Sequence, residues 1–287
     1  MFKDFERKHP GCKKKHLGSL IVNTPERNKR LDIVTFYSII VISLLEVTIM
    51  KNMCLNKENQ VVMANDLIKS KSCLSLNEIK LLRLTIMQIV KEDNDFYTYK
   101  ISIMELAKLL DIPSTHLYSD VYDICRHLLQ EVVEIGDGNP KHKWKIFQWC
   151  SSCSYNNGII TIKLHEDLQP YLIQLKGYYT QYVLEDIILL KTIYAIRIYE
   201  LIREAMKGQK VYADKIAIIT LSEETIRKAT GTEDKYTKMS MFRARVIDAA
   251  LKEINAKLGY NISYEPLKCS RKIVGFRFKI ESKNNGK

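Results

Sequence analysis

Basic side chains that can hydrogen-bond to nucleic acid are concentrated near the carboxyl end of the chain. Lys235, Lys238, Arg243 and Arg245 lie within one short stretch. An arginine guanidinium can donate two hydrogen bonds to O6 and N7 of guanine, a contact that contributes roughly 1–3 kcal/mol of discrimination between bases. Lysine more often holds the phosphate backbone. This stretch therefore indicates contacts with double-stranded DNA, although an anionic membrane surface would also attract it.

The distribution of charge supports a polyanionic partner. The net charge of the 287-residue chain is +12, and residues 235–287 hold 13 Lys and Arg against 4 Asp and Glu, a net +9. Residues 51–234 are nearly balanced, with 23 basic and 24 acidic side chains. Basic clustering of this kind is the electrostatic footprint of a protein that binds a phosphate backbone.

The basic stretch has the periodicity of an amphipathic helix. Four aliphatic side chains recur at helical spacing and predict its buried stripe: Ile247, Leu251, Ile254 and Leu258. Three basic side chains are spaced by seven and share the opposite face: Lys238, Arg245 and Lys252. Arg243 lies closer to the apolar edge and is expected to stay solvated because it is near the start of the helix. Without other features, the simplest interpretation would be the solvated face of a surface helix.

The first half of the organised chain predicts the element order of a winged helix. A helix is expected over 74–90 and a strand over 97–102. Ser102 and Glu105 have the spacing of a capping box at the start of the next helix. A helix over 116–135 would bury five side chains: Tyr118, Val121, Ile124, Leu128 and Val132. After a turn, two strand-like runs joined by a polar loop predict a hairpin over 143–164.

The second half repeats this order. It predicts a long helix over 184–206, a strand over 215–220, a short helix that ends at Gly231, the basic helix and a second hairpin over 260–280. The halves match at an offset of about 118–119, which places Arg126 on Arg245. Repetition of a whole element order favours two tandem domains. We predict an α+β, mainly helical chain with winged-helix domains at 61–180 and 181–287.

The predicted fold explains what the basic residues would contact. In a helix-turn-helix, the second helix enters the major groove and flanking parts hold phosphates. The second hairpin would form a wing whose turn carries Lys268, Arg271 and Lys272. Helix and wing are basic together, which strengthens the prediction of a DNA-binding domain.

Residues 1–60 differ from the rest and form a predicted N-terminal extension. Residues 33–50 are 18 residues with a single charge, Glu46, and a transmembrane span needs about 20 apolar residues. Three interpretations stay open: a disordered extension, a start assigned too far upstream, and a membrane anchor. Seven scattered cysteines are an odd number, which favours a reducing cytoplasm over a disulfide framework.

The residue types required for catalysis or metal binding are poorly represented. Cys150 and Cys153 have metal or redox spacing, but a zinc site needs two more ligands with suitable spacing. The chain contains no phosphate-binding G-x-x-x-x-G-K-[ST] motif and no His-x-His pair for a nicking centre. Tyr178, Tyr179 and Tyr182 could stack on single-stranded bases or pack at the domain boundary. We expect no metal, no cofactor, no catalytic residue and no small-molecule substrate.

Several segments resemble one known family. They are "NDLIKSKSCLSLNEIKLLRLTI", "LKTIYAIRIYELI" and "YTKMSMFRARVIDAALKEINAKLGYNISYE", followed by "RKIVGFRFKI". From about Val61 to Ile280 the chain looks like the replication initiator proteins of iteron-bearing bacterial plasmids. Thr192 departs from the family pattern, where serine is expected. Residues 1–60 have no counterpart in the family.

The resemblance implies a function and partners. Family members bind directly repeated origin sequences as monomers and repress their own promoter as dimers joined largely through the first domain. They open the origin with the host initiator and recruit the host helicase. The second domain is the stronger major-groove reader, here with Lys235, Lys238, Arg243, Arg245, Arg271 and Lys272 at the matching positions. In the first domain, backbone contacts are expected from Arg126 and from the wing residues Lys141, Lys143 and Lys145.

Two alternatives remain beside a non-enzymatic initiator. A transcriptional repressor of the same fold would share every feature except the origin repeats. A nicking or priming enzyme would need metal-dependent chemistry, for which the sequence offers little.

Overall fold

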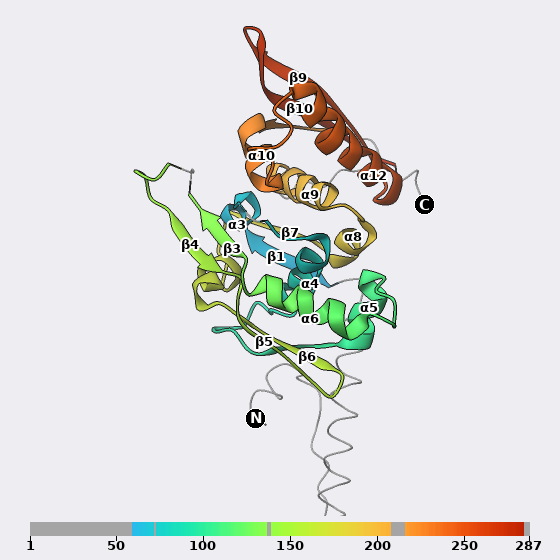
Figure 1. The fold of residues 1–287 in the computed structure, drawn as a ribbon. Helices are drawn as coiled ribbons and strands as arrows, with labels where there is room; N and C mark the ends of the chain where they lie inside the picture. The colour runs from blue at the N-terminus through green and yellow to red at the C-terminus, as the bar shows by residue number, and fades with distance from the viewer. Residues whose placement is uncertain (1–58, 72, 137–138, 208–215, 284–287) are drawn as a thin grey trace, which may run out of the picture. The chain divides into compact units, whose positions relative to one another are not determined.

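The computed structural model describes residues 59–71, 73–136, 139–207 and 216–283 (Figure 1). The predicted extension lies almost entirely outside this part of the chain, as does the apolar run over 33–50. Within the described ranges, no helix is both long enough and apolar enough to cross a membrane. The elements form four small antiparallel sheets with helices packed between them.

The first winged helix has the predicted core elements. They are α4 (Leu76–Ile86), β2 (Tyr99–Ser102), α5 (Ile103–Leu110), α6 (Leu117–Leu128), β5 (Cys150–Asn156) and β6 (Ile159–Leu164). The three strands pair in the order β2-β6-β5. A capping box starts α4, because the Ser75 side chain accepts from the Glu78 amide and Glu78 accepts from the Ser75 amide. The predicted capping box at Ser102 is wrong, since its side chain makes no cap hydrogen bond.

The hairpin of the first domain differs from the prediction. Helix α6 ends at Leu128, and β3 (Val132–Ile135) follows and pairs with β4 (Lys145–Gln148). Val132 therefore lies in a strand and is exposed, and Tyr118 is 60% exposed rather than buried. The segment between the two predicted strands is itself a strand, β5, which pairs with β6. The wing is thus β5–β6, and β3–β4 is a separate hairpin inserted before it.

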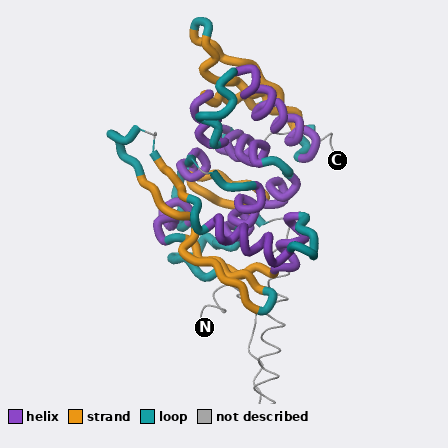
Figure 2. Tube along the Cα trace, in the orientation of Figure 1, coloured by secondary structure: helices purple, strands orange, loops and turns teal. Residues whose placement is uncertain are grey.

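The second winged helix follows the prediction closely. It comprises α9 (Ile193–Ala205), β8 (Ala217–Ser222), α10 (Glu223–Thr230), a helix over residues 239–257, β9 (Tyr260–Cys269) and β10 (Lys272–Ser282). Its strand order, β8-β10-β9, matches the β2-β6-β5 order of the first. Ser222 caps α10 at its start, and Gly231 ends it in the left-handed conformation, with φ of 61°. Figure 2 shows β9–β10 as a long hairpin beside the helices.

The sheet of the second domain packs closely on its helices. Phe242, Phe276 and Phe278 are fully buried, and burial of each ring contributes ~1.5–3 kcal/mol. Gly275 lies at a bulge in β10 where a Cβ atom would come within 2.7 Å of the Leu221 carbonyl oxygen. Only glycine fits this close approach of β8 and β10.

The predicted long helix over 184–206 is interrupted. Helix α8 (Leu184–Leu189) ends before an extended Leu190, and α9 begins after the N-cap Thr192. The Thr192 hydroxyl accepts from the Ala195 amide, a capping role that serine and threonine share. Threonine in place of the serine of the family pattern therefore preserves the N-terminal cap of α9.

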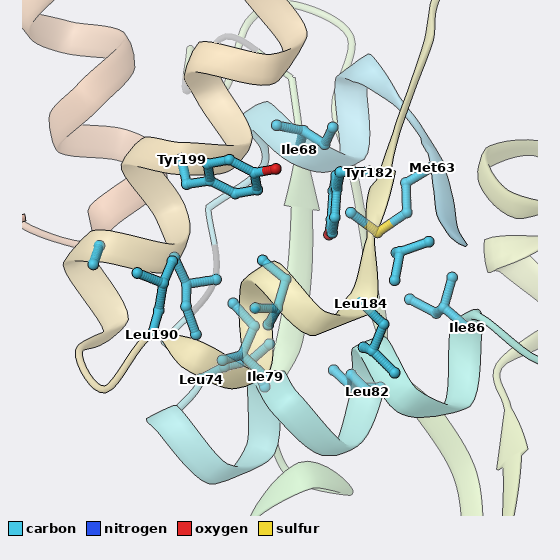
Figure 3. Packing of buried hydrophobic residues seen from close by; sticks show 14 of the residues in the cluster. Met63, Ile68, Leu74, Ile79, Leu82, Ile86, Tyr182, Leu184, Leu190 and Tyr199 are labelled. Atoms are coloured by element: carbon cyan, nitrogen blue, oxygen red, sulfur yellow. The ribbon is translucent and has the colours of Figure 1, made fainter. Parts of the chain in front are cut away.

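Strands β1 (Gln60–Ala64) and β7 (Tyr179–Val183) pair with each other, and the short α3 (Asn65–Lys69), η1 (Glu166–Leu168) and α7 (Gln169–Leu172) complete the described elements. Strand β7 spans residues 180 and 181, between which the sequence analysis placed the boundary of the two domains. The position of that boundary stays a prediction. Side chains from α3, α4, α8 and α9 interdigitate in the core (Figure 3); among them are Ile68, Leu82, Leu184 and Tyr199.

A buried charged network joins these elements. Glu200 on α9 accepts from Arg83 on α4 (2.6 Å), from Arg197 (2.7 Å) and from the Tyr182 hydroxyl (2.5 Å). Arg197 also donates to the carbonyls of Ile68, at 2.8 Å, and Ala229, at 2.8 Å. Burial alone would raise the pKa of Glu200, but attraction to Arg83 and Arg197 holds it below its usual value. The carboxylate stays charged and ties α4, α3 and α10 to α9.

Candidate nucleic-acid interface

The basic helix of the second domain presents its charged face to solvent. It runs through α11 (Met239–Phe242), the π-helical segment η2 (Arg243–Asp248) and α12 (Ala249–Lys257). Ile247, Leu251 and Ile254 are buried as predicted, whereas Leu258 lies just beyond the helix and is half-buried. Arg245 and Lys252 on this helix are exposed, as are its N-cap residue Lys238 and Lys235 in the preceding turn. We call these four side chains the helix cluster.

The helix cluster is free to bind an external anion. No salt bridge joins any of its four side chains to another residue in the described part of the chain. The π-helical segment places an extra residue in the helix beside Arg245, and such bulges often occur at functional sites. The cluster therefore has the charge and the exposure that contact with phosphates or base edges requires.

Arg227 on α10 positions the start of this helix, a role that the sequence analysis missed. Its guanidinium donates to the carbonyls of Thr232 (3.0 Å), Lys235 (2.9 Å) and Tyr236 (3.2 Å). It also lies over the Phe242 ring, 3.9 Å from the centroid. One side chain thus fixes the turn between α10 and α11, including Tyr236 in a left-handed conformation. The only sequence signal was the i,i+4 spacing of Glu223 and Arg227.

Arg243 connects the helix to the wing. Its Nε donates to the Tyr264 hydroxyl on β9 (3.0 Å), and that hydroxyl donates to Asp248 (2.7 Å). The bond to Tyr264 raises the pKa of Arg243, which stays charged. The sequence predicted a solvated side chain near the apolar edge, but Arg243 is half-buried against the wing. Its first role is therefore to hold helix and wing together.

The wing carries its basic side chains where the sequence placed them. Lys268 lies near the end of β9, Arg271 in the turn and Lys272 at the start of β10. All three are exposed and, among the described residues, form no salt bridge. Ser270 in the turn has φ of 57°, so the hairpin reverses tightly. We call these three side chains the wing cluster.

The first domain presents fewer free charges. Arg126 is exposed in the last turn of the twelve-residue α6, whereas Arg245 lies in the middle of its helix, so the offset that matched them does not describe equivalent positions. Lys141 and Lys143 are exposed between β3 and β4. Lys145 forms a salt bridge to Asp167 (2.6 Å), which lowers the pKa of that carboxyl. These three lysines belong to the inserted hairpin and not to the wing.

The cysteines and tyrosines considered for metal binding, thiol chemistry or base stacking do not come together in one site. In the described ranges, no group of three His, Cys, Asp or Glu side chains could hold a metal ion. Hydrogen bonding to Cys125 lowers the pKa of Cys153, but hydrogen bonding to Cys150 and burial together raise it to about 12. Cys153 is therefore a neutral thiol. Of the three tyrosines considered for stacking, Tyr182 is buried in the Glu200 network and Tyr178 is 92% exposed.

Two winged helices in tandem, the second with an exposed basic helix and wing, define the class of tandem winged-helix DNA-binding proteins. Two family models match the chain: "Initiator Replication protein, WH1" over residues 60–203, and "Initiator Rep protein, WH2" over residues 222–280. The chain belongs to this family of replication initiators.

Two solved structures are similar to the chain. A crystal structure of the Pi initiator protein in complex with iteron DNA shares 18% sequence identity, with a TM-score of 0.65, and the match covers 80% of this chain and 100% of that one. A selenomethionine derivative of domains 2 and 3 of RctB shares 12% identity, with a TM-score of 0.41, over 76% of this chain and 82% of that one. The first likeness supports the tandem winged-helix fold.

Proposed function

We propose that this protein starts plasmid DNA replication by binding directly repeated sequences at an origin, with its second domain as the main major-groove reader. The observation that carries the proposal is the joint exposure of the helix cluster and the wing cluster without salt-bridge partners in the described residues. In a winged helix, these two elements face the major groove and the adjacent backbone. The Pi initiator, of similar fold, was crystallised with iteron DNA, which supports the assignment.

The two domains divide the task. Arg245 is the best-placed base reader, because it is exposed and lies on the same face as Lys238 and Lys252. The wing lysines and arginine serve the phosphate backbone, as do Arg126, Lys141 and Lys143 of the first domain. Lys145 contributes less, since Asp167 neutralises it. If both domains read one side of the duplex, their helices lie about one turn apart, ~10–10.5 bp, and the repeats span roughly 20 bp.

The resemblance to plasmid initiators extends the proposal to partners. We assign the monomer to the origin repeats and a homodimer, joined largely through the first domain, to repression of its own promoter. The host initiator and helicase are the remaining partners, and the site of action is the cytoplasm. The protein acts by binding and not as an enzyme.

A footprint on the DNA that flanks the gene tests the proposal. The expected result is protection of regularly spaced direct repeats, with affinity that falls steeply between ~50 and ~200 mM salt. A reporter plasmid that carries the protected region should replicate only when the protein is supplied. Protection of a lone inverted repeat at the promoter, without origin activity, would instead favour a repressor. Metal-dependent strand cleavage that disappears with a tyrosine substitution would favour a nicking enzyme.

A further inference from the structure

The inserted hairpin β3–β4 carries an exposed indole among basic side chains. Trp144, just before β4, is 54% exposed, whereas Trp149, the second tryptophan of the chain, is 1% exposed. Residues 139–145 read "NPKHKWK", with three lysines and no acidic residue. Lys141 and Lys143 are exposed and form no salt bridge within the described ranges. The indole and these two ammonium groups are therefore exposed within four consecutive residues of one loop.

The indole is held so that its ring, and not its N–H group, is available. Nε1 of Trp144 donates to the Pro140 carbonyl at 3.3 Å, which engages the one polar atom of the side chain. The Lys141 amide donates to Asn139 Oδ1 at 3.0 Å and further orders the turn. A ring with its donor satisfied offers contacts through its π face.

The base of the hairpin is anchored to the domain. Phe147 is buried and stacks on Tyr171, with ring centroids 6.0 Å apart. Lys145 is bound to Asp167 and lies 5.1 Å from the centroid of the Phe147 ring. A fixed base presents Trp144 at a defined place, which reduces the entropy lost when a ligand binds.

We infer that Trp144, with Lys141 and Lys143, is a stacking platform for single-stranded DNA. Nucleic acid is the ligand that needs both parts of this surface, because its phosphates pair with lysines and its bases stack on aromatic rings. In a duplex the faces of the bases are covered by their neighbours, so a stacking ring finds a free face only on an unpaired strand. This inference rests on the proposed function, since an opened origin supplies that strand.

The two tryptophans allow a direct test with the full-length protein. Trp144 should be quenched when an oligothymidylate of about fifteen nucleotides stacks on it, and buried Trp149 should not respond. Trp144→Ala should weaken binding of this oligonucleotide by roughly 5- to 100-fold, whereas Trp144→Phe keeps a ring and should stay within about 3-fold of the wild type. Tyr122→Ala, which removes a ring that is 66% exposed on α6, is the matched control and should change nothing.

The outcomes separate this inference from the proposed function. Affinity for the duplex repeats should be the same in the wild type, Trp144→Ala and Trp144→Phe. Quenching by duplex but not by oligothymidylate, or quenching on raising the protein concentration without DNA, would overturn the platform. If no repeats were protected but oligothymidylate still quenched Trp144, the proposed function would be rejected and the stacking platform would still be supported.

Discussion

The two winged helices share a framework but differ in what they present. Helices α5 and α10 are both eight residues long and begin 120 residues apart, at Ile103 and Glu223, and the three-stranded sheets have the same order. On the helix that follows and in the turn just before it, the second domain exposes the basic helix cluster. The first exposes tyrosine and aspartate instead, as at Tyr122 and Asp123. The fold thus sets where a helix is presented, and the exposed side chains decide what it can bind.

The largest expected effect concerns the network that joins the two halves. Glu200→Gln removes the charge that two buried arginines share, and an uncompensated buried charge typically costs ~3–5 kcal/mol. Because Arg197 binds carbonyls from both α3 and α10, we expect both domains to lose stability together in urea unfolding. Glu233→Gln is the control, since the side chains of Glu233 and its partner Lys71 are 39% and 37% exposed and the pair should contribute little. Loss of stability in only one domain would show that the halves fold independently.

The second prediction compares one arginine from each domain. Arg245→Ala should weaken binding to the specific repeat by more than tenfold, at least ~1.4 kcal/mol. Its binding to random DNA should weaken far less. Arg126→Ala, at the end of α6, should lower the affinity for either DNA by less than about threefold. Electrophoretic mobility shifts with both DNAs measure the four affinities. Equal losses for Arg245→Ala on specific and random DNA would show that it contacts phosphate only.

Sequence patterns predicted the second domain better than the first for identifiable reasons. Gly231 and the stripe residues Ile247, Leu251 and Ile254 are local signals, and the structure confirms them. In the first domain, "VVEI" continues the apolar pattern of α6, so β3 was predicted as helix, and the polar β5 was predicted as a loop. Similarly, no breaker residue marks the interruption at Leu190. Pairing with another strand decides the cases of β3 and β5, and local propensity does not contain it.

The candidate site shows the same limit. The exposed members of the helix and wing clusters could be chosen from charge and periodicity alone. The positioning roles of Arg227 and Arg243 could not, because they depend on carbonyls and a tyrosine that only the folded chain brings within reach. The sequence also could not show that Lys145 forms a salt bridge whereas Lys143 does not, because Asp167 approaches Lys145 only in the folded chain.

The third prediction compares the serines that precede α5 and α10, which are also 120 residues apart. The Ser222 hydroxyl accepts from the Thr225 amide at 3.0 Å, whereas Ser102 makes no such bond. Ser222→Ala should therefore lower the free energy of unfolding by ~1 kcal/mol, and Ser102→Ala should leave it almost unchanged. Thermal and urea unfolding of the two variants measure the difference. A comparable loss at Ser102 would mean that its side chain caps α5 in solution.

The smallest effect separates a free lysine of the wing from a paired lysine of the inserted hairpin. Each phosphate contact contributes roughly 0.9 to the slope of log affinity against log salt concentration. Lys272→Ala should therefore reduce the magnitude of that slope by about 1, because Lys272 is exposed and unpaired among the described residues. It should weaken binding to specific and to random DNA equally. Lys145→Ala should leave the slope unchanged, since Asp167 already neutralises Lys145. If Lys145→Ala flattened the slope as much as Lys272→Ala, the salt bridge would have to open on DNA, and the inserted hairpin would be a backbone contact equal to the wing.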